Sequence, residues 1–251
     1  MRPDVGLYST FLQRAYDNVL HDVCLQNLPV TFALDRGGLV GADGPTHHGV
    51  FDLSYLRHIP NLVLMAPRDE NELRRAMLTA LQWEGPFAYR YPRGNALGLT
   101  RPETLEPFDV GKGEKLRDGC DATIFTLGTM VEPALQAAEK LAEEGISLAV
   151  VDARFVKPLD KDLLFAEAQR TGVVMTAEEN ALQGGFGAAV LEALADEGLN
   201  PRLLRFGIPD GFVEQGSQAE LRHELKLDAD GMVERIRELL LSRGGGSLQE
   251  D

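Results

Sequence analysis

Short apolar runs alternate along this sequence with longer segments of helical periodicity, and this alternation limits the fold more than any other feature. Connections of about ten or more residues return the chain over a sheet, so that neighbouring strands pair in parallel. The sequence therefore predicts an α/β fold with parallel sheets and with ligands at the carboxyl ends of the strands. The expected strands are residues 5–8, 30–34, 62–66, 87–91, 122–127, 147–152, 173–177 and 202–206.

The chain divides into two such regions. Between residues 98 and 120 helical periodicity disappears, and proline and glycine become frequent. This composition is typical of an inter-domain linker, here with one expected edge strand near residues 112–116. We predict a first α/β domain over residues 1–97, a second over 121–242, and a flexible tail over 243–251.

The expected helices follow the strands. The first begins at Ser9 or Thr10, either of which can cap it, and carries one apolar stripe to Val23. Asp69 caps the next helix, which runs to Trp83. In the second region, helices are expected over residues 131–144, 159–169, 187–197 and 229–241.

The first region is short for a complete domain. It has four expected strands, and the sequence enters directly at one of them. Such a sheet leaves a long strand edge unpaired, which invites pairing with another chain. We therefore expect residues 1–97 to form part of a domain rather than a whole one.

Charge and cysteine content narrow the function. The sequence has 25 Lys and Arg against 39 Asp and Glu, a formal net charge of −14. Nucleic-acid binding needs basic residues to neutralise phosphates, so it is not expected. Cys24 and Cys120 lack metal-ligand spacing and are expected as reduced thiols. No apolar run is long enough for a membrane span, and residues 1–6 do not resemble a signal peptide, so the expected location is the cytoplasm.

Chemically active side chains follow the strands of the first region. They are Tyr8, Phe11 and Arg14 after the first strand, Arg36, Asp43, His47 and His48 after the second, and Arg93 after the fourth. Because parallel strands end at the same side of a sheet, these residues are expected along one rim. Three arginines and two histidines in an acidic protein indicate a pocket for an anion, since the guanidinium fork binds phosphate bidentately.

Each of these residues also has a purely structural interpretation. Arg36 could pair with Asp35 or Asp43 and only brace its loop. A loop histidine, His47 or His48, could simply be satisfied by a backbone carbonyl rather than act on protons.

Three other motifs carry weaker predictions. The segment 41–44 with Asn71 resembles a diphosphate and Mg²⁺ motif, but an alanine interrupts it and metal binding is not expected there. The segment Gly184-Gly185-Phe186-Gly187 stands at the start of an expected helix and favours tight packing over phosphate binding. The acidic pairs at 143–144 and 178–179 are expected to be solvated or to cap helices.

The motifs taken together resemble one family. The sequence segments are Tyr8 to Asp17, Asp35-Arg36, Gly41 to Gly49, Phe51 to Arg57, Tyr91 to Asn95, Val151 to Asp160, and Glu178-Glu179-Asn180. In this order they resemble the 1-deoxy-D-xylulose-5-phosphate synthases over residues 5–240. The resemblance implies a pyrimidine-binding domain of the thiamine-enzyme type, incomplete here, followed by a transketolase C-terminal domain.

The resemblance also implies a reaction. These thiamine diphosphate enzymes condense pyruvate with D-glyceraldehyde 3-phosphate and release CO₂, in the biosynthesis of isoprenoids, thiamine and pyridoxal. By resemblance, Phe11 stacks on the aminopyrimidine ring of the cofactor. Tyr8, Arg36, Asp43 and Arg93 hold the substrate phosphate, and Arg14 and His47 contact the cofactor-bound intermediate, with His47 as the candidate for proton transfer.

Parts of the family pattern have no counterpart here. The diphosphate domain with its Mg²⁺ motif is absent from the sequence, and no glutamate precedes Tyr8. The expectation is therefore a C-terminal portion, inactive alone, that needs a missing N-terminal segment or chain and forms a homodimer when complete. The alternatives are half of another transketolase-like thiamine enzyme and a non-catalytic dimerisation module.

Overall fold

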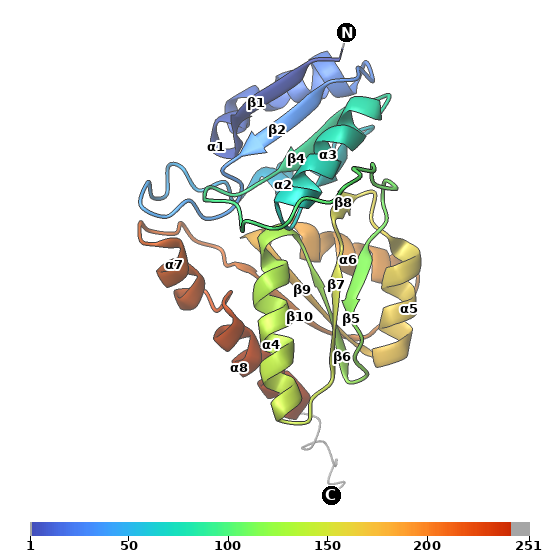
Figure 1. Ribbon diagram of the computed structural model, residues 1–251, viewed down its shortest axis with the longest axis vertical. Coiled ribbons are helices and arrows are strands. Elements are labelled where there is room, and N and C mark those ends of the chain that lie inside the picture. Colours follow the sequence, from blue (N-terminus) through green and yellow to red (C-terminus); the bar gives the residue numbers. More distant parts are fainter. Residues whose placement is uncertain (1, 242–251) are drawn as a thin grey trace, which may run out of the picture.

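Two five-stranded sheets, one above the other in Figure 1, organise the computed structural model, which describes residues 2–241. The upper sheet has the strand order β1-β2-β4-β3-β8. Its strands are β1 (Asp4–Tyr8), β2 (Thr31–Asp35), β3 (Val63–Met65), β4 (Phe87–Arg90) and β8 (Phe155–Lys157). The first four pair in parallel, so their carboxyl ends share one rim.

The lower sheet has the order β10-β9-β6-β7-β5. Its strands are β5 (Glu114–Arg117), β6 (Ala122–Thr126), β7 (Leu148–Asp152), β9 (Val173–Ala181) and β10 (Arg202–Ile208). Strand β9 is buried along its whole length because strands flank it on both sides. It continues four residues beyond the predicted end at residue 177, and this extension carries a buried polar sequence towards the upper sheet.

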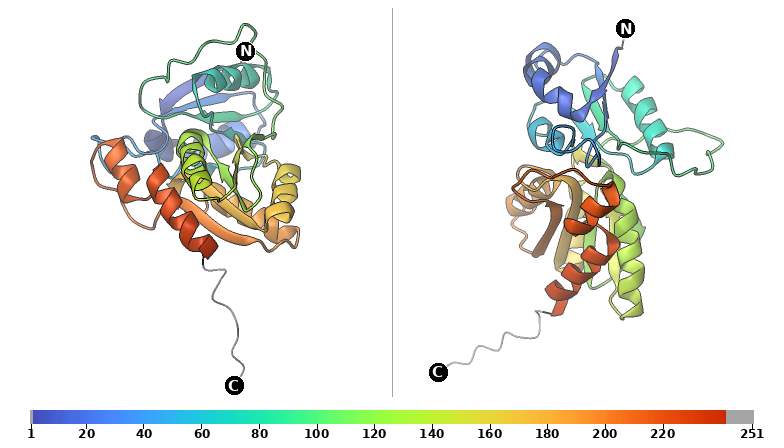
Figure 2. Two further views of the ribbon diagram at one scale, coloured as in Figure 1. Left: turned by 60° about the horizontal axis from the view of Figure 1, so that its bottom comes forward. Right: turned by 90° about the vertical axis from the view of Figure 1, so that its left-hand side faces the viewer.

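Helices cover both sheets (Figures 1 and 2). They are α1 (Ser9–Leu12), α2 (Asp52–Leu56), α3 (Glu70–Gln82), α4 (Val131–Glu143), α5 (Lys161–Thr171), α6 (Phe186–Asp196), α7 (Gln218–Glu224) and α8 (Ala229–Leu241). Asp69 caps α3 as predicted, by accepting hydrogen bonds from the backbone of Asn71 and Glu72. The short helices α2 and α7 were not predicted, because one or two turns show too little periodicity.

The α/β class with two largely parallel sheets is confirmed, and each sheet has in addition one antiparallel strand. Strand β8 pairs antiparallel with β3, and β5 pairs antiparallel with β7. Each lies at the edge of its sheet, where an antiparallel strand is common in otherwise parallel sheets. Strand β8 belongs in sequence to the second region and completes the sheet of the first, so the two halves share a sheet.

The first predicted helix is wrong in detail. After α1 the chain forms a 3₁₀ turn over Gln13–Ala15 and a π-helical segment over Asn18–Cys24. Neither Ser9 nor Thr10 caps the helix, because Tyr8 is the N-cap residue and the Thr10 hydroxyl donates to the Thr46 carbonyl instead. The irregular helix therefore contacts the loop that follows β2.

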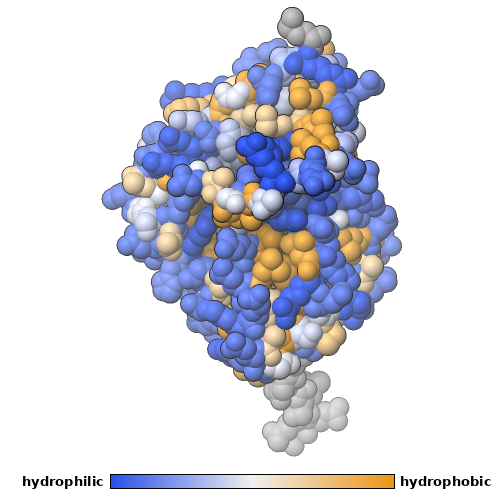
Figure 3. Space-filling model, in the orientation of Figure 1, coloured by the Kyte–Doolittle hydropathy of each residue, from blue (hydrophilic) through white to orange (hydrophobic). Residues whose placement is uncertain are grey.

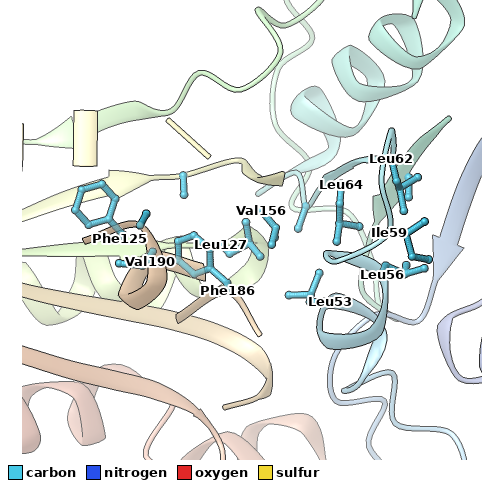
Figure 4. Packing of buried hydrophobic residues seen from close by; sticks show 14 of the residues in the cluster. Leu53, Leu56, Ile59, Leu62, Leu64, Phe125, Leu127, Val156, Phe186 and Val190 are labelled. Carbon is cyan, nitrogen blue, oxygen red and sulfur yellow. The ribbon is translucent and has the colours of Figure 1, made fainter. Parts of the chain in front are cut away.

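One apolar core extends through both halves. Leu53, Leu56 and Leu64 of the upper half pack in the same cluster as Leu127 and Phe186 of the lower half (Figure 4). Burial of apolar surface on this scale stabilises the contact between the two sheets. The rim of the upper sheet is thus held against the lower half.

The outer edge of β1 pairs with no strand among residues 2–241, as expected from the short first region. Its first three residues are exposed.

The face in Figure 3 is mostly hydrophilic, with apolar groups gathered near the middle of the view. No helix within residues 2–241 is long and apolar enough to cross a membrane. The predicted tail over 243–251 lies outside the described residues.

Candidate active site

The rim of the upper sheet brings together most of the predicted site residues. Tyr8 ends β1, Arg36 directly follows β2, and Arg93 lies three residues beyond β4. Asp43 and His47 lie in the loop that connects β2 to α2. Parallel pairing of β1, β2 and β4 therefore produces the common rim that the sequence predicted.

Two guanidinium groups converge on one carboxylate at this rim. Arg36 Nη1 lies 2.6 Å from Asp43 Oδ2, and Arg93 Nη1 lies 3.1 Å from the same oxygen. The side chains are partly exposed, 22% for Arg36, 31% for Asp43 and 41% for Arg93. Two positive charges against one negative charge leave the cluster with an excess positive charge open to solvent.

The backbone after β2 is shaped to present this cluster. Arg36 has a positive φ of 59°. Gly38 and Gly49 exchange two backbone hydrogen bonds of 2.7 and 2.9 Å, which close the loop between them. A Cβ at Gly49 would overlap the Arg36 carbonyl oxygen and the Ser9 side chain, so only glycine fits. The closed loop fixes Asp43 beside Arg36.

Three rings in contact with one another lie beside the charged cluster of Arg36, Asp43 and Arg93. The rings of Tyr8 and Phe11 stack at 5.3 Å, and Phe11 meets the His47 ring edge-on at 5.8 Å. The Arg36 guanidinium lies 4.1 Å from the centre of the Tyr8 ring, a cation–π contact. Phe11 is half exposed and can offer its ring to a planar ligand. Arg14 is exposed on the 3₁₀ turn, and within residues 2–241 no hydrogen bond or ion pair joins it to this group.

The arrangement suits a small phosphorylated molecule. In the described part of the chain each guanidinium makes its ion pair through Nη1, which leaves Nε and Nη2 of Arg36 and Nη2 of Arg93 for a second acceptor. Phosphate oxygens are strong partners for such donors. The His47 ring, hydrogen-bonded at Nδ1 to the Thr46 hydroxyl at 2.9 Å, lies across Phe11 where a proton could be moved.

Known proteins resemble this chain along nearly its whole length. The family "Transketolase, pyrimidine binding domain" matches residues 1–97, and "Transketolase, C-terminal domain" matches residues 111–232. The 1-deoxy-D-xylulose-5-phosphate synthase of Syntrophotalea carbinolica is 67% identical over 240 residues, which are 96% of this chain and 38% of that protein. A synthase of Geobacter metallireducens named 1-deoxy-D-xylulose-5-phosphate synthase 1 is 60% identical over 237 residues, 94% of this chain and 38% of that protein.

Among solved structures, one described as "Split gene transketolase, inactive beta4 tetramer" is similar, with a TM-score of 0.84 and 32% identity. The match covers 95% of this chain and 76% of that one. The chain belongs to the 1-deoxy-D-xylulose-5-phosphate synthase family. It spans about 38% of the length of the curated synthases that it matches.

The loop after β2 contains a second histidine, His48, whose environment differs from that of His47. His48 is 2% exposed, and its two ring nitrogens contact Val40 and Glu214 of the backbone. Backbone groups hydrogen-bond both ring nitrogens, and one of these groups is a carbonyl. The interpretation of a loop histidine satisfied by a backbone carbonyl is therefore correct for His48. The interpretation of Arg36 as a partner of Asp43 is also correct, although Arg93 shares the same carboxylate.

The predicted rim omitted a contribution from the lower half. Gln218, the first residue of α7, reaches the backbone of Leu39 and Arg93. Ser217 and Glu220 form a reciprocal capping box at the start of this helix. The spacing Ser-x-x-Glu is visible in the sequence and could have located α7, although not its contact with the rim.

Buried charged side chains lie behind the rim. Arg90 donates 2.6 Å to Asp52 and 2.9 Å to the carbonyl of Glu179. Glu179, 3% exposed, accepts from Arg222 at 2.6 Å and from Thr129 at 3.1 Å. Burial raises the pKa of Asp52, against the opposing charge of Arg90. The prediction that Glu179 is solvated or caps a helix is therefore wrong, because it lies in an ion pair between strand and helix.

The neighbouring Glu178 does cap a helix. Its two carboxylate oxygens accept from the backbone of Phe186 and Gly187, both at 2.7 Å, at the start of α6. This carboxylate occupies the position that a phosphate would take, and a Cβ at Gly185 would overlap it. Gly185 and Gly187 thus serve close packing, as expected. Burial raises the pKa of Glu178 to about 7, although the two backbone donors lower it.

The remaining motifs make contacts within the fold. Asn71 donates to the Thr100 carbonyl at 3.0 Å, while Asp43 faces two guanidiniums. Residues 2–241 contain no group of three or more His, Cys, Asp or Glu that could hold a metal ion. Glu143 and Glu144 are exposed, as expected, and Glu144 pairs with Arg237.

Proposed function

We propose that this chain supplies the acceptor-phosphate side of a 1-deoxy-D-xylulose-5-phosphate synthase. The reaction condenses pyruvate with D-glyceraldehyde 3-phosphate and releases CO₂, as a step of isoprenoid, thiamine and pyridoxal biosynthesis. The single observation that carries the proposal is the convergence of Arg36 and Arg93 on Asp43 at an open rim. The name of the similar synthases supports the choice of a phosphorylated substrate.

In this proposal Arg36 and Arg93 bind the phosphate of the aldehyde. Asp43 holds the two guanidiniums at a fixed separation, since both donate to the same oxygen. Tyr8 lies under the Arg36 guanidinium and orients it. Charge-assisted bidentate hydrogen bonds of this kind give both affinity and orientation.

Phe11, Arg14 and His47 face the cofactor side. The half-exposed ring of Phe11 can stack on the aminopyrimidine of thiamine diphosphate, which fits a planar aromatic group. Bound thiamine diphosphate supplies carbanion stabilisation. His47 then moves a proton to or from the reacting oxygen, and Arg14 contributes positive charge nearby. We propose that Mg²⁺ and the diphosphate are anchored mainly by the part of the enzyme outside this chain.

The remaining portion of the enzyme is the main partner. The chain covers 38% of its synthase relatives, and the similar split transketolase is described as an inactive tetramer of one subunit. We propose that this chain is inactive alone, that residues 1–97 and 121–242 are its two units with 98–120 between them, and that the complete enzyme is a cytoplasmic homodimer. A native mass spectrum of material purified from its source shows whether a companion chain accompanies it.

The test combines this chain with the portion of the Syntrophotalea carbinolica synthase that has no counterpart in this chain. We expect turnover of pyruvate with D-glyceraldehyde 3-phosphate by the combination and none by the chain alone. In Arg93→Ala, KM for the aldehyde rises by roughly 10- to 100-fold, the loss expected for a hydrogen bond to a charged group. His47→Ala lowers kcat, because it removes a proton-transfer group.

Arg101→Ala is the matched control, since Arg101 is an exposed arginine of the linker. An unchanged KM in Arg93→Ala would refute the phosphate assignment. If the chain is instead a non-catalytic dimerisation module, Arg93→Ala and His47→Ala will both associate normally with the partner. The combination of the two portions will then show no synthase turnover at all.

A further inference from the structure

The lower half of the molecule contacts the rim through one side chain at the start of α7. Gln218 Nε2 donates to the carbonyl of Leu39 at 2.6 Å and to the carbonyl of Arg93 at 3.1 Å. Leu39 belongs to the loop after β2, and Arg93 to the turn after β4. One amide group therefore ties together the two rim segments that carry the phosphate-binding side chains.

His48 makes the reciprocal connection from the loop to the lower half. The Val40 amide donates to His48 Nδ1 at 3.1 Å, so this nitrogen carries no proton. The ring proton therefore lies on Nε2, which donates to the Glu214 carbonyl at 3.2 Å. At 2% exposure the ring is enclosed between these two backbone groups.

Packing around these bonds is close. A Cβ at Gly41 would lie 3.1 Å from the Gly216 carbonyl oxygen, and one at Gly44 would lie 3.3 Å from Gln215 Cβ. Leu39 is fully buried in the apolar core of the lower half. Figures 1 and 2 both show the loop after β2 beside the segment that precedes α7. The loop is thus anchored in the half of the molecule to which it does not belong in sequence.

The charged cluster depends on the same backbone. Arg93 Nη1 donates to the Val40 carbonyl at 3.0 Å as well as to Asp43. The Val40 amide is the group bound by His48, and its neighbour Leu39 is bound by Gln218. A cavity of about 460 Å³ lies here, with Arg93, Val40 and Gln218 among its lining residues.

From these contacts we infer that His48 and Gln218 are positioning residues for the acceptor phosphate. They touch no substrate, but set the separation of the loop that carries Asp43 from the turn that carries Arg93. The inference rests on the proposed function, and it extends the recognition of the phosphorylated aldehyde to the lower half of the molecule. Catalytic geometry is sensitive to small displacements, so loosening either bond lowers the use of a phosphorylated acceptor.

The test compares two acceptors in the assembled enzyme: D-glyceraldehyde 3-phosphate and D-glyceraldehyde, which lacks the phosphate. Gln218→Met keeps the length of the side chain and removes both hydrogen bonds, and His48→Phe keeps the ring and removes both of its bonds. We expect each to lower kcat/KM for the phosphorylated aldehyde by about tenfold, mainly through KM, and to leave D-glyceraldehyde nearly unaffected.

Two further variants make the result specific. The amide of His48→Gln offers one acceptor and one donor, as the imidazole does, and we expect it to restore most of the selectivity. His223→Gln alters an exposed histidine of α7, the helix that begins with Gln218, and serves as the control. An equal loss with both acceptors, or an unchanged ratio between them, would overturn the inference.

A second measurement does not depend on turnover. In this chain, hydrogen exchange of the Val40 amide is expected to accelerate by about tenfold in His48→Phe and in Gln218→Met, and not in His223→Gln. Unchanged exchange at Val40 would contradict the positioning role directly. Absence of turnover in the parent assembly, together with accelerated exchange in the variants, would count against the proposed reaction and leave the connection between the halves supported.

Discussion

Charged side chains occur in two contrasting settings in this molecule: along the rim of the upper sheet and between the two halves. At the rim, Arg36 and Arg93 share Asp43, and the three side chains are between 22% and 41% exposed. Between the halves, the side chains of Arg154, Glu72 and Asp152 are only 11%, 3% and 0% exposed, while Arg68 and Glu114 at the edge of the same cluster are 24% and 42% exposed. The ion pairs of the rim are open to solvent, whereas those between the halves are enclosed around Arg154, Glu72 and Asp152.

The enclosed cluster joins residues from both halves. Arg154 Nε donates to Glu72 at 2.8 Å and its Nη2 pairs with Glu114. Arg68 donates to Glu114 at 2.7 Å and to Asp152 at 3.1 Å. Arg68 and Glu72 lie in the upper half, while the other three lie in the lower half. The cluster therefore fixes the two halves relative to each other.

The balance of charge separates the two settings. The rim has two guanidiniums and one carboxylate, so an anion can complete it. The enclosed cluster has two guanidiniums and four carboxylates, since Asp69 also pairs with Arg68 at 3.3 Å, and an additional anion would be repelled. Burial and repulsion by Glu72 accordingly raise the pKa of Asp152, against the two arginines. The comparison indicates that arginine binds a ligand where its carboxylate partners are too few, and supports the fold where they are sufficient.

The largest effect on stability is expected from breaking the enclosed cluster. Arg154→Met removes one of the two guanidiniums that pair with the buried carboxylate of Glu72, and breaking such a buried pair costs about 3–5 kcal/mol. We expect the free energy of unfolding to fall by this amount in urea denaturation of this chain. Arg101→Met, at an exposed arginine, is the control. A loss below about 1 kcal/mol, the value typical of exposed pairs, would remove the distinction between the two settings.

A second prediction concerns the pH dependence of stability. Burial raises the pKa of Glu178 to about 7, above that of a solvated glutamate. The folded state therefore binds a proton that the unfolded state releases, and stability falls as the pH rises from about 5 to about 8, by at most about 3 kcal/mol from this group. Glu178→Gln removes the titration, so its stability should change less over this range.

The measurement is the free energy of unfolding of both proteins at several pH values. Glu144→Gln, which alters an exposed carboxylate, should retain the slope of the parent chain. Parallel pH profiles for the parent chain and Glu178→Gln would show that burial does not shift the titration of this residue.

Local patterns in the sequence predicted the rim because each of its members either ends a strand or lies in the segment that follows one. Strand order and parallel pairing then bring Tyr8, Arg36 and Arg93 together without further information. The shared use of Asp43 by two arginines depends on side chains 50 residues apart and has no local signal. The same is true of the buried setting of Glu179, whose partners Arg222 and Thr129 lie in distant elements.

The errors in the fold have the same origin. Strand β8 has three residues and pairs with β3 some 90 residues earlier, so neither periodicity nor length revealed it. The first helix shows a clear apolar stripe, yet it forms 3₁₀ and π-helical turns. Its Thr10 hydroxyl donates to the loop after β2, and tertiary contacts of this kind override helical propensity.

The smallest effect on stability is expected at the rim, from Arg36→Met. The substitution removes a partly exposed ion pair with Asp43 and the contact with Tyr8, and we expect the free energy of unfolding to change by about 1 kcal/mol or less. The same variant should raise KM for D-glyceraldehyde 3-phosphate in the assembled enzyme as strongly as Arg93→Ala does. Denaturation of Arg36→Met beside Arg154→Met, together with that KM, compares the two settings directly. A loss of 3 kcal/mol or more, about the value for a buried pair, would mean that the rim arginine supports the fold rather than a ligand.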